Sequence, residues 1–181
     1  VVIGGGVVGV RTLYHLTREG WSDVVMLERT ELTAGSTWHA AGLLPLFNMS
    51  YTVGQLHKYS VDLYKRLPAE TGQDVSFHVT GNLRLATCRD RMDEYKKYCG
   101  TANTIGVPFQ LISPAEVKEL WPLVNLGGDA DTPAVIGALY HPDDGHIAPA
   151  DLTMALRRAA RSAGAEINEQ TEVTGAVQMP S

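Results

Sequence analysis

The sequence predicts an α/β fold that begins with a parallel βαβ unit, and three observations support this prediction. An apolar run at residues 1–3 leads directly into a glycine-rich turn at residues 4–9. A helical pattern follows to about Glu19, where Gly20 is expected to end the helix. A second apolar run, residues 24–28, ends in an acid. Strand, helix and strand within ~30 residues imply parallel strands joined by a right-handed crossover.

The rest of the chain predicts a second domain inserted into the first. After the acid, a loop rich in small residues extends from residue 29 to about 49, and a loop of that length favours a functional role. A long amphipathic helix beginning near Val53 follows. Shorter, alternating patterns then indicate an α+β module over residues 77–140. We therefore expect a nucleotide-binding domain made of residues 1–76 and 141–181, interrupted by this module.

The most specific helix start lies inside the module. Ser113 and Glu116 have the spacing of a capping box, and Pro114 occupies the first helical position. Other elements follow from apolar periodicity and turn residues. We expect strands around Leu83 and at 107–112, 135–140, 165–168 and 172–177, and helices at 89–103 and 149–163.

Composition and charge exclude several classes of partner. The formal net charge of −5, without basic clusters, argues against a nucleic-acid or anionic membrane surface. No apolar run approaches the ~20 residues that a transmembrane helix needs. The two cysteines are too far apart for a metal or redox motif and fit a reducing compartment.

The glycine-rich turn indicates a dinucleotide site. Gly4, Gly6 and Gly9 form a GxGxxG pattern between a strand and a helix, with Val7 and Val8 between the second and third glycines. A pyrophosphate would lie at the helix N-terminus, where N–H groups and the helix dipole favour negative charge. Such turns also occur for structural reasons alone. Here an acid, Glu28, follows 19 residues after Gly9, as expected for a group that binds ribose hydroxyls. FAD or NAD is therefore favoured over NADP.

The loop after the acid favours FAD over NAD. An NAD enzyme normally returns quickly to helix and strand, whereas this chain continues with small and hydroxyl-bearing residues at 35–37. These residues would let the chain approach a second set of phosphate oxygens. The small residues at 40–42 would let main chain lie against a flat ring.

Several motifs together resemble a known family. They are the turn at 4–9, Glu28-Arg29, the segment GSTWHAAGL at 35–43, FH at 77–78, GNLRLAT at 81–87, LYHPDDGHI at 139–147 and LTMAL at 152–156. The chain resembles the dimethylglycine dehydrogenase and sarcosine dehydrogenase family, more closely the former, over nearly its whole length. The resemblance implies a Rossmann-like FAD-binding domain of the glutathione-reductase/D-amino-acid-oxidase type, interrupted by an inserted α+β segment of the substrate domain.

The resemblance also implies a set of cofactor-binding residues. In this family the histidine after the loop tryptophan carries FAD covalently, which assigns that role to His39. The alternative is a packing or hydrogen-bonding histidine beside a non-covalent flavin. Val173 corresponds to the position whose backbone meets the adenine. The expected cofactor-binding residues are Gly4, Gly6, Val7, Val8, Gly9, Glu28, Arg29, Gly35, Ser36, Thr37, Trp38, His39, Ala40, Ala41, Gly42, Leu43 and Val173.

The implied reaction is oxidative N-demethylation of dimethylglycine or sarcosine. The one-carbon unit would go to formaldehyde or tetrahydrofolate, and an electron-transfer flavoprotein or oxygen would accept the electrons. The protein would be cytoplasmic if bacterial and in the mitochondrial matrix if eukaryotic. Three alternatives remain open: a non-catalytic relative that regulates pyruvate dehydrogenase phosphatase, an oxygen-using amine oxidase, and an NAD-dependent dehydrogenase.

No catalytic residue is identifiable in this sequence. The first strand begins only three residues before the turn, and the chain stops within an expected strand, which is typical of a piece of a longer protein. The family's substrate contacts and folate-binding region would lie mostly beyond residue 181. We therefore expect this piece alone to be inactive.

The segment from His141 to His146 offers a competing metal-site interpretation. It carries two imidazoles and two carboxylates, which are metal-ligand chemistries. Its Pro-Asp-Asp-Gly sequence is also turn chemistry leading to the helix at Pro149, and we favour that interpretation. No metal is expected. The family usually has an acid before this proline, whereas this chain has Ala148.

Overall fold

The computed structural model describes residues 1–177. Over these residues the chain folds into two compact units. Of the described residues, the first unit contains 1–42, 63–77 and 147–177, and the second contains 43–62 and 78–146. Both units are therefore discontinuous in sequence, and each is described separately below.

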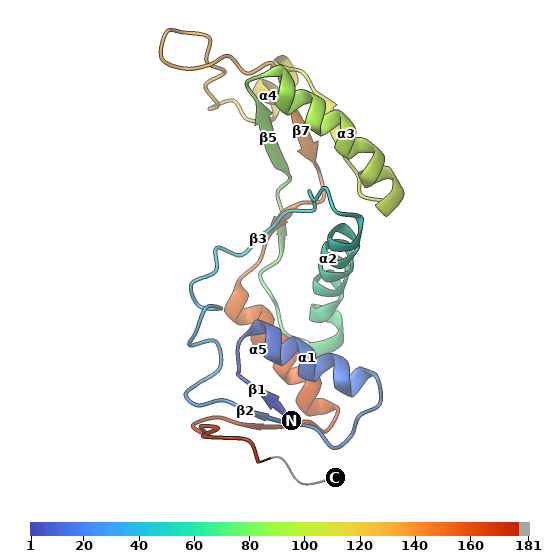
Figure 1. Ribbon diagram of the computed structural model, residues 1–181, viewed down its shortest axis with the longest axis vertical. Helices are drawn as coiled ribbons and strands as arrows, with labels where there is room; N and C mark the ends of the chain where they lie inside the picture. Colours follow the sequence, from blue (N-terminus) through green and yellow to red (C-terminus); the bar gives the residue numbers. More distant parts are fainter. Residues whose placement is uncertain (178–181) are drawn as a thin grey trace. The chain divides into compact units, whose positions relative to one another are not determined.

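The first unit contains the expected parallel βαβ unit (Figure 1). Strand β1 (Val2–Ile3) leads through the glycine turn to helix α1 (Val7–Arg18), which returns to strand β2 (Val25–Leu27). Strand β9 (Glu166–Asn168) pairs with the other side of β2, so the sheet order is β1-β2-β9 and all three strands are parallel. Parallel pairing puts the carboxyl ends of β1 and β2 at one edge of the sheet, where a nucleotide site is expected.

Two helices pack together in the core of this unit. Helix α5 (Pro149–Ser162) lies against α1, as Figure 1 shows. Val10 and Leu13 on α1 are fully buried, as are Leu156 on α5 and Met26 on β2. Burial of one such aliphatic side chain stabilises the folded state by about 1.5–3 kcal/mol. The apolar faces of the helices and the central strand thus fix the position of the glycine turn.

Helix α2 (Tyr51–Thr71) is the expected long amphipathic helix and is divided between the units at residues 62 and 63. Leu63 and Leu67 are buried in the core of the first unit. Pro68 lies in the last turn, and the helix ends at Gly72, which has a positive φ of 66°. Glycine adopts this conformation without steric cost and so ends the helix.

The second unit contains two antiparallel sheets. One has the order β3-β8-β4, and its three strands are two residues long: Leu43–Leu44, Gly145–His146 and His78–Val79. The other has the order β5-β7-β6, with strands Asn82–Ala86, Gly137–His141 and Gln110–Ile112. Helices α3 (Arg89–Ile105) and α4 (Pro114–Leu120) accompany the longer sheet.

The core of this unit lies between the longer sheet and α4. Ile112, Val117, Val124 and Ala138 form a buried cluster, against which Leu83 and other partly buried apolar side chains pack. The capping box at the start of α4 is present, because the Ser113 hydroxyl accepts from the Glu116 N–H while the Glu116 carboxylate accepts from the Ser113 N–H. The predicted helix start is therefore confirmed.

Several sequence expectations need correction. Residues 172–177 form no strand, because this segment makes no ladder with another strand among the residues described. The strand expected at 107–112 covers only Gln110–Ile112. The expected boundaries of the inserted module, 77 and 140, also differ from the structural division. Residues 43–62 and 141–146 group with the second unit. Residues 178–181 of the expected first domain lie outside the described part of the chain.

The turn expected between His141 and Gly145 is present at Pro142 and Asp143. Over residues 1–177, no helix is both long enough and apolar enough to cross a membrane.

Candidate functional site

The glycine turn connects β1 to α1 in a conformation that only glycine accommodates well. Gly4 has a φ of +102°, and its N–H donates to the Leu27 carbonyl at 2.9 Å, which joins the ends of the two strands. A Cβ atom at Gly9 would overlap the carbonyl oxygen of Gly4, so the third glycine of the motif allows the helix to start close to the strand. Helix α1 has Gly6 as N-cap, with no side-chain cap and no acid in its first turn. Its N-terminus therefore favours an anion.

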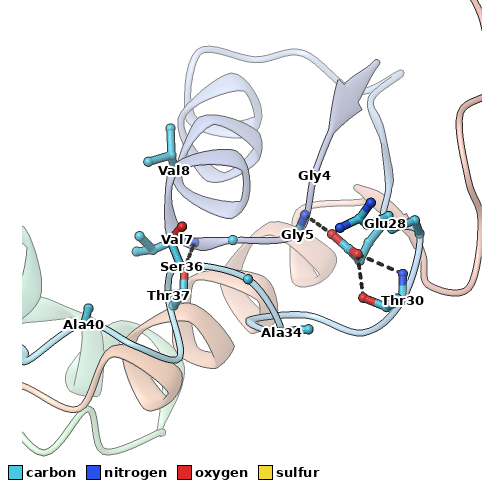
Figure 2. A pocket seen from close by; sticks show the side chains of 13 residues that line it. Gly4, Gly5, Val7, Val8, Glu28, Thr30, Ala34, Ser36, Thr37 and Ala40 are labelled. Carbon is cyan, nitrogen blue, oxygen red and sulfur yellow. Dashed lines mark hydrogen bonds between the residues drawn. The ribbon is translucent and has the colours of Figure 1, made fainter.

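Glu28 follows the end of β2 and faces the glycine turn (Figure 2). One carboxylate oxygen accepts from the Gly5 N–H at 2.6 Å, and the other accepts from the N–H and hydroxyl of Thr30 at 2.8 and 3.0 Å. Chiefly because of the hydrogen bond from the Thr30 N–H, and despite partial burial, the pKa of Glu28 lies below its usual value. The group is thus an oriented carboxylate, whose remaining lone pairs suit the hydroxyls of a ribose.

Thr37 fixes the long loop against the same turn. Its hydroxyl accepts from the Val7 N–H at 2.8 Å, and the N–H of Thr33 donates to the Gly5 carbonyl at 3.1 Å. Thr33 has a φ of +70°, which marks a tightly turned segment. The Thr37 hydroxyl accepts a hydrogen bond from the helix N-terminus and can still donate its own proton. That proton is therefore available to an anionic ligand.

A cavity of about 560 Å³ lies between the turn, Glu28 and the loop (Figure 2). Most of the residues around it are small, so a ligand can approach the backbone closely. Ten of the sequence-predicted residues line it: Gly4, Gly6, Val7, Val8, Glu28, Arg29, Gly35, Ser36, Thr37 and Ala40. Its chemistry is that of a nucleotide site, with a helix N-terminus that has no acid in its first turn for phosphate and a carboxylate for ribose.

Three lining residues were not among those predicted. Gly5 stands at the variable position of the GxGxxG pattern, although its N–H is the donor that holds Glu28. Thr30 lies two residues after the strand-ending acid, and a hydroxyl at that spacing is the sequence signal that could have predicted it. Ala34 contributes a small side chain to the cavity and carries no distinctive sequence signal.

The other predicted residues lie elsewhere. Gly9 supports the turn from behind, while Trp38 and His39 are exposed outside this cavity, the Trp38 side chain by 71%. Nδ1 of His39 lies 3.1 Å from the Gly35 carbonyl oxygen. Ala41 and Leu43 are exposed and do not line the cavity.

Gly42 and Val173 also lie outside the cavity. Gly42 has a φ of +74°, and a Cβ atom there would overlap the Ile147 carbonyl oxygen. Val173 lines a smaller cavity of about 240 Å³, which shares Gly4, Glu28 and Arg29 with the larger one.

His141 and Asp144, from the segment for which a metal site was the competing interpretation, lie in a buried polar cluster in the second unit. His141 is fully buried and its Nε2 lies 3.0 Å from the Tyr98 hydroxyl, while Asp144 accepts from the Leu46 N–H at 2.9 Å. Burial lowers the pKa of His141 to about 4 and raises that of Asp144 to about 6. Within residues 1–177, no group of three or more His, Cys, Asp or Glu side chains is arranged to hold a metal ion.

Sequence comparison identifies the family. The pattern of the family described as FAD dependent oxidoreductase matches residues 1–179. The chain belongs to this family. It is 44% identical over 180 residues to rat (Rattus norvegicus) dimethylglycine dehydrogenase, a mitochondrial protein, covering 99% of this chain and 20% of the relative. Human (Homo sapiens) sarcosine dehydrogenase, also mitochondrial, is 42% identical over 176 residues, covering 97% of this chain and 18% of the relative.

Structural comparison agrees with this family. The crystal structure of L-proline dehydrogenase from P. horikoshii superposes with a TM-score of 0.87 and 33% identity, covering 97% of this chain and 45% of that chain. The expected FAD-binding fold of the D-amino-acid-oxidase type is thereby confirmed, as is the resemblance to the dimethylglycine and sarcosine dehydrogenases. The chain spans about a fifth of the length of the curated relatives that it matches.

The residues around the larger cavity fit FAD. Glu28 would hold the adenosine ribose, while the α1 N-terminus and the Thr37 hydroxyl would hold the pyrophosphate. A Cβ atom at Gly6 would lie only 3.1 Å from the Thr37 hydroxyl oxygen. A side chain there would crowd this approach.

Proposed function

We propose that this chain is the FAD-binding part of an enzyme that oxidatively removes an N-methyl group from a small amino acid. Dimethylglycine is the first candidate substrate and sarcosine the second. The identity with the relatives of those names supports the substrate class. The observation that carries the proposal is the oriented Glu28 carboxylate beside a helix N-terminus with no acid in its first turn, in a chain of the FAD dependent oxidoreductase family.

The cofactor and the protein would have different roles in the reaction. Bound FAD would supply the hydride acceptor for the N-methyl carbon. The substrate would be left as an iminium, and water would convert it to formaldehyde and the demethylated amine. The substrate amine must be neutral to release hydride, so a nearby base or a lowered amine pKa is expected, and none of the residues lining the cavity is assigned the role of base. The part of the site carried by residues 4–40 binds and orients the nucleotide.

His39 is the proposed covalent attachment point. The Gly35 carbonyl oxygen can only accept a hydrogen bond, so the contact to Nδ1 places the imidazole proton on Nδ1. Nε2 then carries the free lone pair and is the nitrogen that would bond to the flavin. The ring is exposed and so accessible for this reaction.

A gel experiment tests the attachment. The full-length protein is denatured in acid and run on a gel, and the protein band is examined for flavin fluorescence. We expect fluorescence in the wild-type band, its loss in His39→Ala, and its retention in the matched control His57→Ala, which removes an imidazole from α2. Flavin released into the supernatant of the wild type would contradict covalent attachment and leave the FAD site unaffected.

A turnover experiment tests the activity. The full-length protein is given dimethylglycine or sarcosine with an artificial electron acceptor, and formaldehyde is measured. Formaldehyde produced in step with acceptor reduction supports N-demethylation. Bound flavin without turnover of either amine would overturn it and favour a non-catalytic regulatory relative.

The electron acceptor and the fate of the one-carbon unit are further parts of the proposal. We propose an electron-transfer flavoprotein as acceptor, so little hydrogen peroxide should form in air, whereas stoichiometric peroxide would identify an oxygen-using oxidase. We also propose that tetrahydrofolate captures the one-carbon unit, so adding it should lower free formaldehyde. The corresponding location is the mitochondrial matrix in a eukaryote and the cytoplasm in a bacterium.

A further inference from the structure

Two exposed histidines face each other across the short sheet of the second unit. His78 on β4 and His146 on β8 are direct partners in the antiparallel register, so their side chains project from the same face of the sheet. Their ring centroids are 5.0 Å apart and the ring planes are inclined by 42°. Both residues are exposed. Neither imidazole has a hydrogen bond or ion pair to another side chain among the residues described.

The separation of the rings is compatible with two imidazoles on one metal ion. Imidazole nitrogen binds Zn²⁺ at about 2.0–2.1 Å, which places each ring centre about 3.2 Å from the metal. At a tetrahedral or octahedral angle, two such rings have centroids about 4.5–5.2 Å apart. The observed 5.0 Å lies within that interval.

The backbone beneath the pair is held tightly. A Cβ atom at Gly145 would overlap the His78 carbonyl oxygen, so the two strands approach as closely as a glycine permits. On the other side of His146, its partner on β3 is the exposed apolar Leu43, which offers no charge. The two imidazoles are thus presented from a fixed base, and a metal that binds them does not have to order the chain first.

We propose that His78 and His146 form a bidentate, exchangeable site for a divalent transition metal ion, with water completing the coordination. Neutral imidazole suits Zn²⁺, Ni²⁺ and Cu²⁺, whereas Mg²⁺ and Ca²⁺ prefer oxygen ligands. Two protein ligands are fewer than the four of a structural zinc site, so the ion would exchange with solvent. This site does not include the buried His141 and does not depend on the proposed function.

Metal titration of the full-length protein tests the site. Zn²⁺ and Ni²⁺ are titrated by calorimetry into wild type, His78→Gln, His146→Gln and the control His57→Gln. We expect one saturable site in the wild type and in His57→Gln. Each of the other two substitutions should weaken binding by at least ~10-fold, because a single imidazole loses the chelate advantage. Mg²⁺ should give no binding.

A second measurement covers the case in which a variant folds poorly. In the wild-type protein, substoichiometric Ni²⁺ should selectively broaden the NMR signals of the His78 and His146 rings, leaving those of His57 sharp. Equal affinity in all four proteins, the absence of saturable binding in the wild type, or broadening at other histidines instead would each overturn the proposal.

Discussion

At the residue scale, the arrangement of Glu28 explains how one side chain organises the proposed nucleotide site. Its two oxygens take hydrogen bonds from opposite sides, one from the glycine turn and one from Thr30. Hydrogen bonds to an ionised acceptor are about twice as strong as neutral ones. The carboxylate therefore fixes its own orientation and at the same time holds the turn in place.

Substitution of Glu28 by glutamine should weaken FAD binding by about 10–100-fold. The glutamine amide presents one oxygen and one NH₂ group, so the N–H of either Gly5 or Thr30 must face another donor. We therefore expect a loss of about 1.5–3 kcal/mol in the free energy of FAD binding. Equilibrium binding of FAD to apoprotein that carries His39→Ala, so that no covalent bond can form, measures this. Glu31→Gln, an exposed neighbour, is the matched control and should bind as the wild type does. Equal affinity in Glu28→Gln would show that the carboxylate does not contribute.

Substitution of Gly9 by alanine should remove FAD and destabilise the protein. The new methyl group would overlap the Gly4 carbonyl, and relief requires a shift of α1 away from β1. We expect a loss of about 1–3 kcal/mol or more in the free energy of unfolding, as for other overpacked sites. Chemical denaturation and flavin content measure the two effects. Gly100→Ala is the control, because nothing lies within 4 Å of a Cβ there, and alanine should stabilise α3 by up to ~1 kcal/mol.

At the element scale, two helices of this chain begin in opposite ways. Helix α4 has a complete capping box, whereas α5 begins at Ala148, which has extended backbone angles and no side-chain cap. Helix α5 packs against α1 beneath the nucleotide site, so its N-terminus affects the stability of that site.

Ala148→Asp should therefore stabilise the protein by about 0.5–1 kcal/mol. The new carboxylate can accept from the first-turn N–H groups of α5 and interact favourably with the helix dipole. Thermal and urea unfolding provide the measurement. Ser113→Ala is the matched opposite change and should destabilise by about 1 kcal/mol, since it removes a cap that is present. No gain in Ala148→Asp would mean that the N-terminus of α5 is already satisfied.

At the scale of the whole molecule, the buried polar cluster makes the stability of the second unit depend on pH. Burial lowers the pKa of His141 from 6.5 to about 4, so the folded state favours the neutral ring. The stabilisation is fully present above pH 6.5 and is lost as the pH falls towards 4. The Arg84 guanidinium adds to this effect, and Tyr98 holds the ring. Burial shifts the pKa of Asp144 in the opposite direction, upward. In the wild type, Asp144 therefore partly offsets the change in unfolding free energy with pH that His141 causes.

Comparison with His141→Gln isolates that contribution. The free energy of unfolding of the wild type, relative to the variant, should fall by up to ~3 kcal/mol between pH 7 and pH 4. Urea unfolding at a series of pH values measures the difference. A difference that stays constant over this range would show that His141 does not titrate in the expected window.

Local patterns predicted the parts of the fold that depend on local chemistry. The glycine turn, the strand-ending Glu28 and the capping box are each determined by residues close in sequence. The role of Gly5 was missed because it depends on a carboxylate 23 positions away. The two-residue strands β3, β4 and β8 have no sequence pattern of their own and exist only through pairing with distant partners, such as Leu43 with His146. A strand also needs a partner to pair with. Residues 172–177 have a strand pattern but pair with no strand among the residues described, and so they form none.

The parallel pairing of β2 with β9 also sets the order of events during synthesis. Val25 is paired with Glu166, which leaves the ribosome 141 residues later. At about 5–20 residues per second, that delay is roughly 7–30 s. Throughout this interval, the edge of β2 that later pairs with β9 stays unpaired, and unpaired strand edges promote aggregation. A chaperone that binds apolar nascent segments would have the most time to act on residues 24–27.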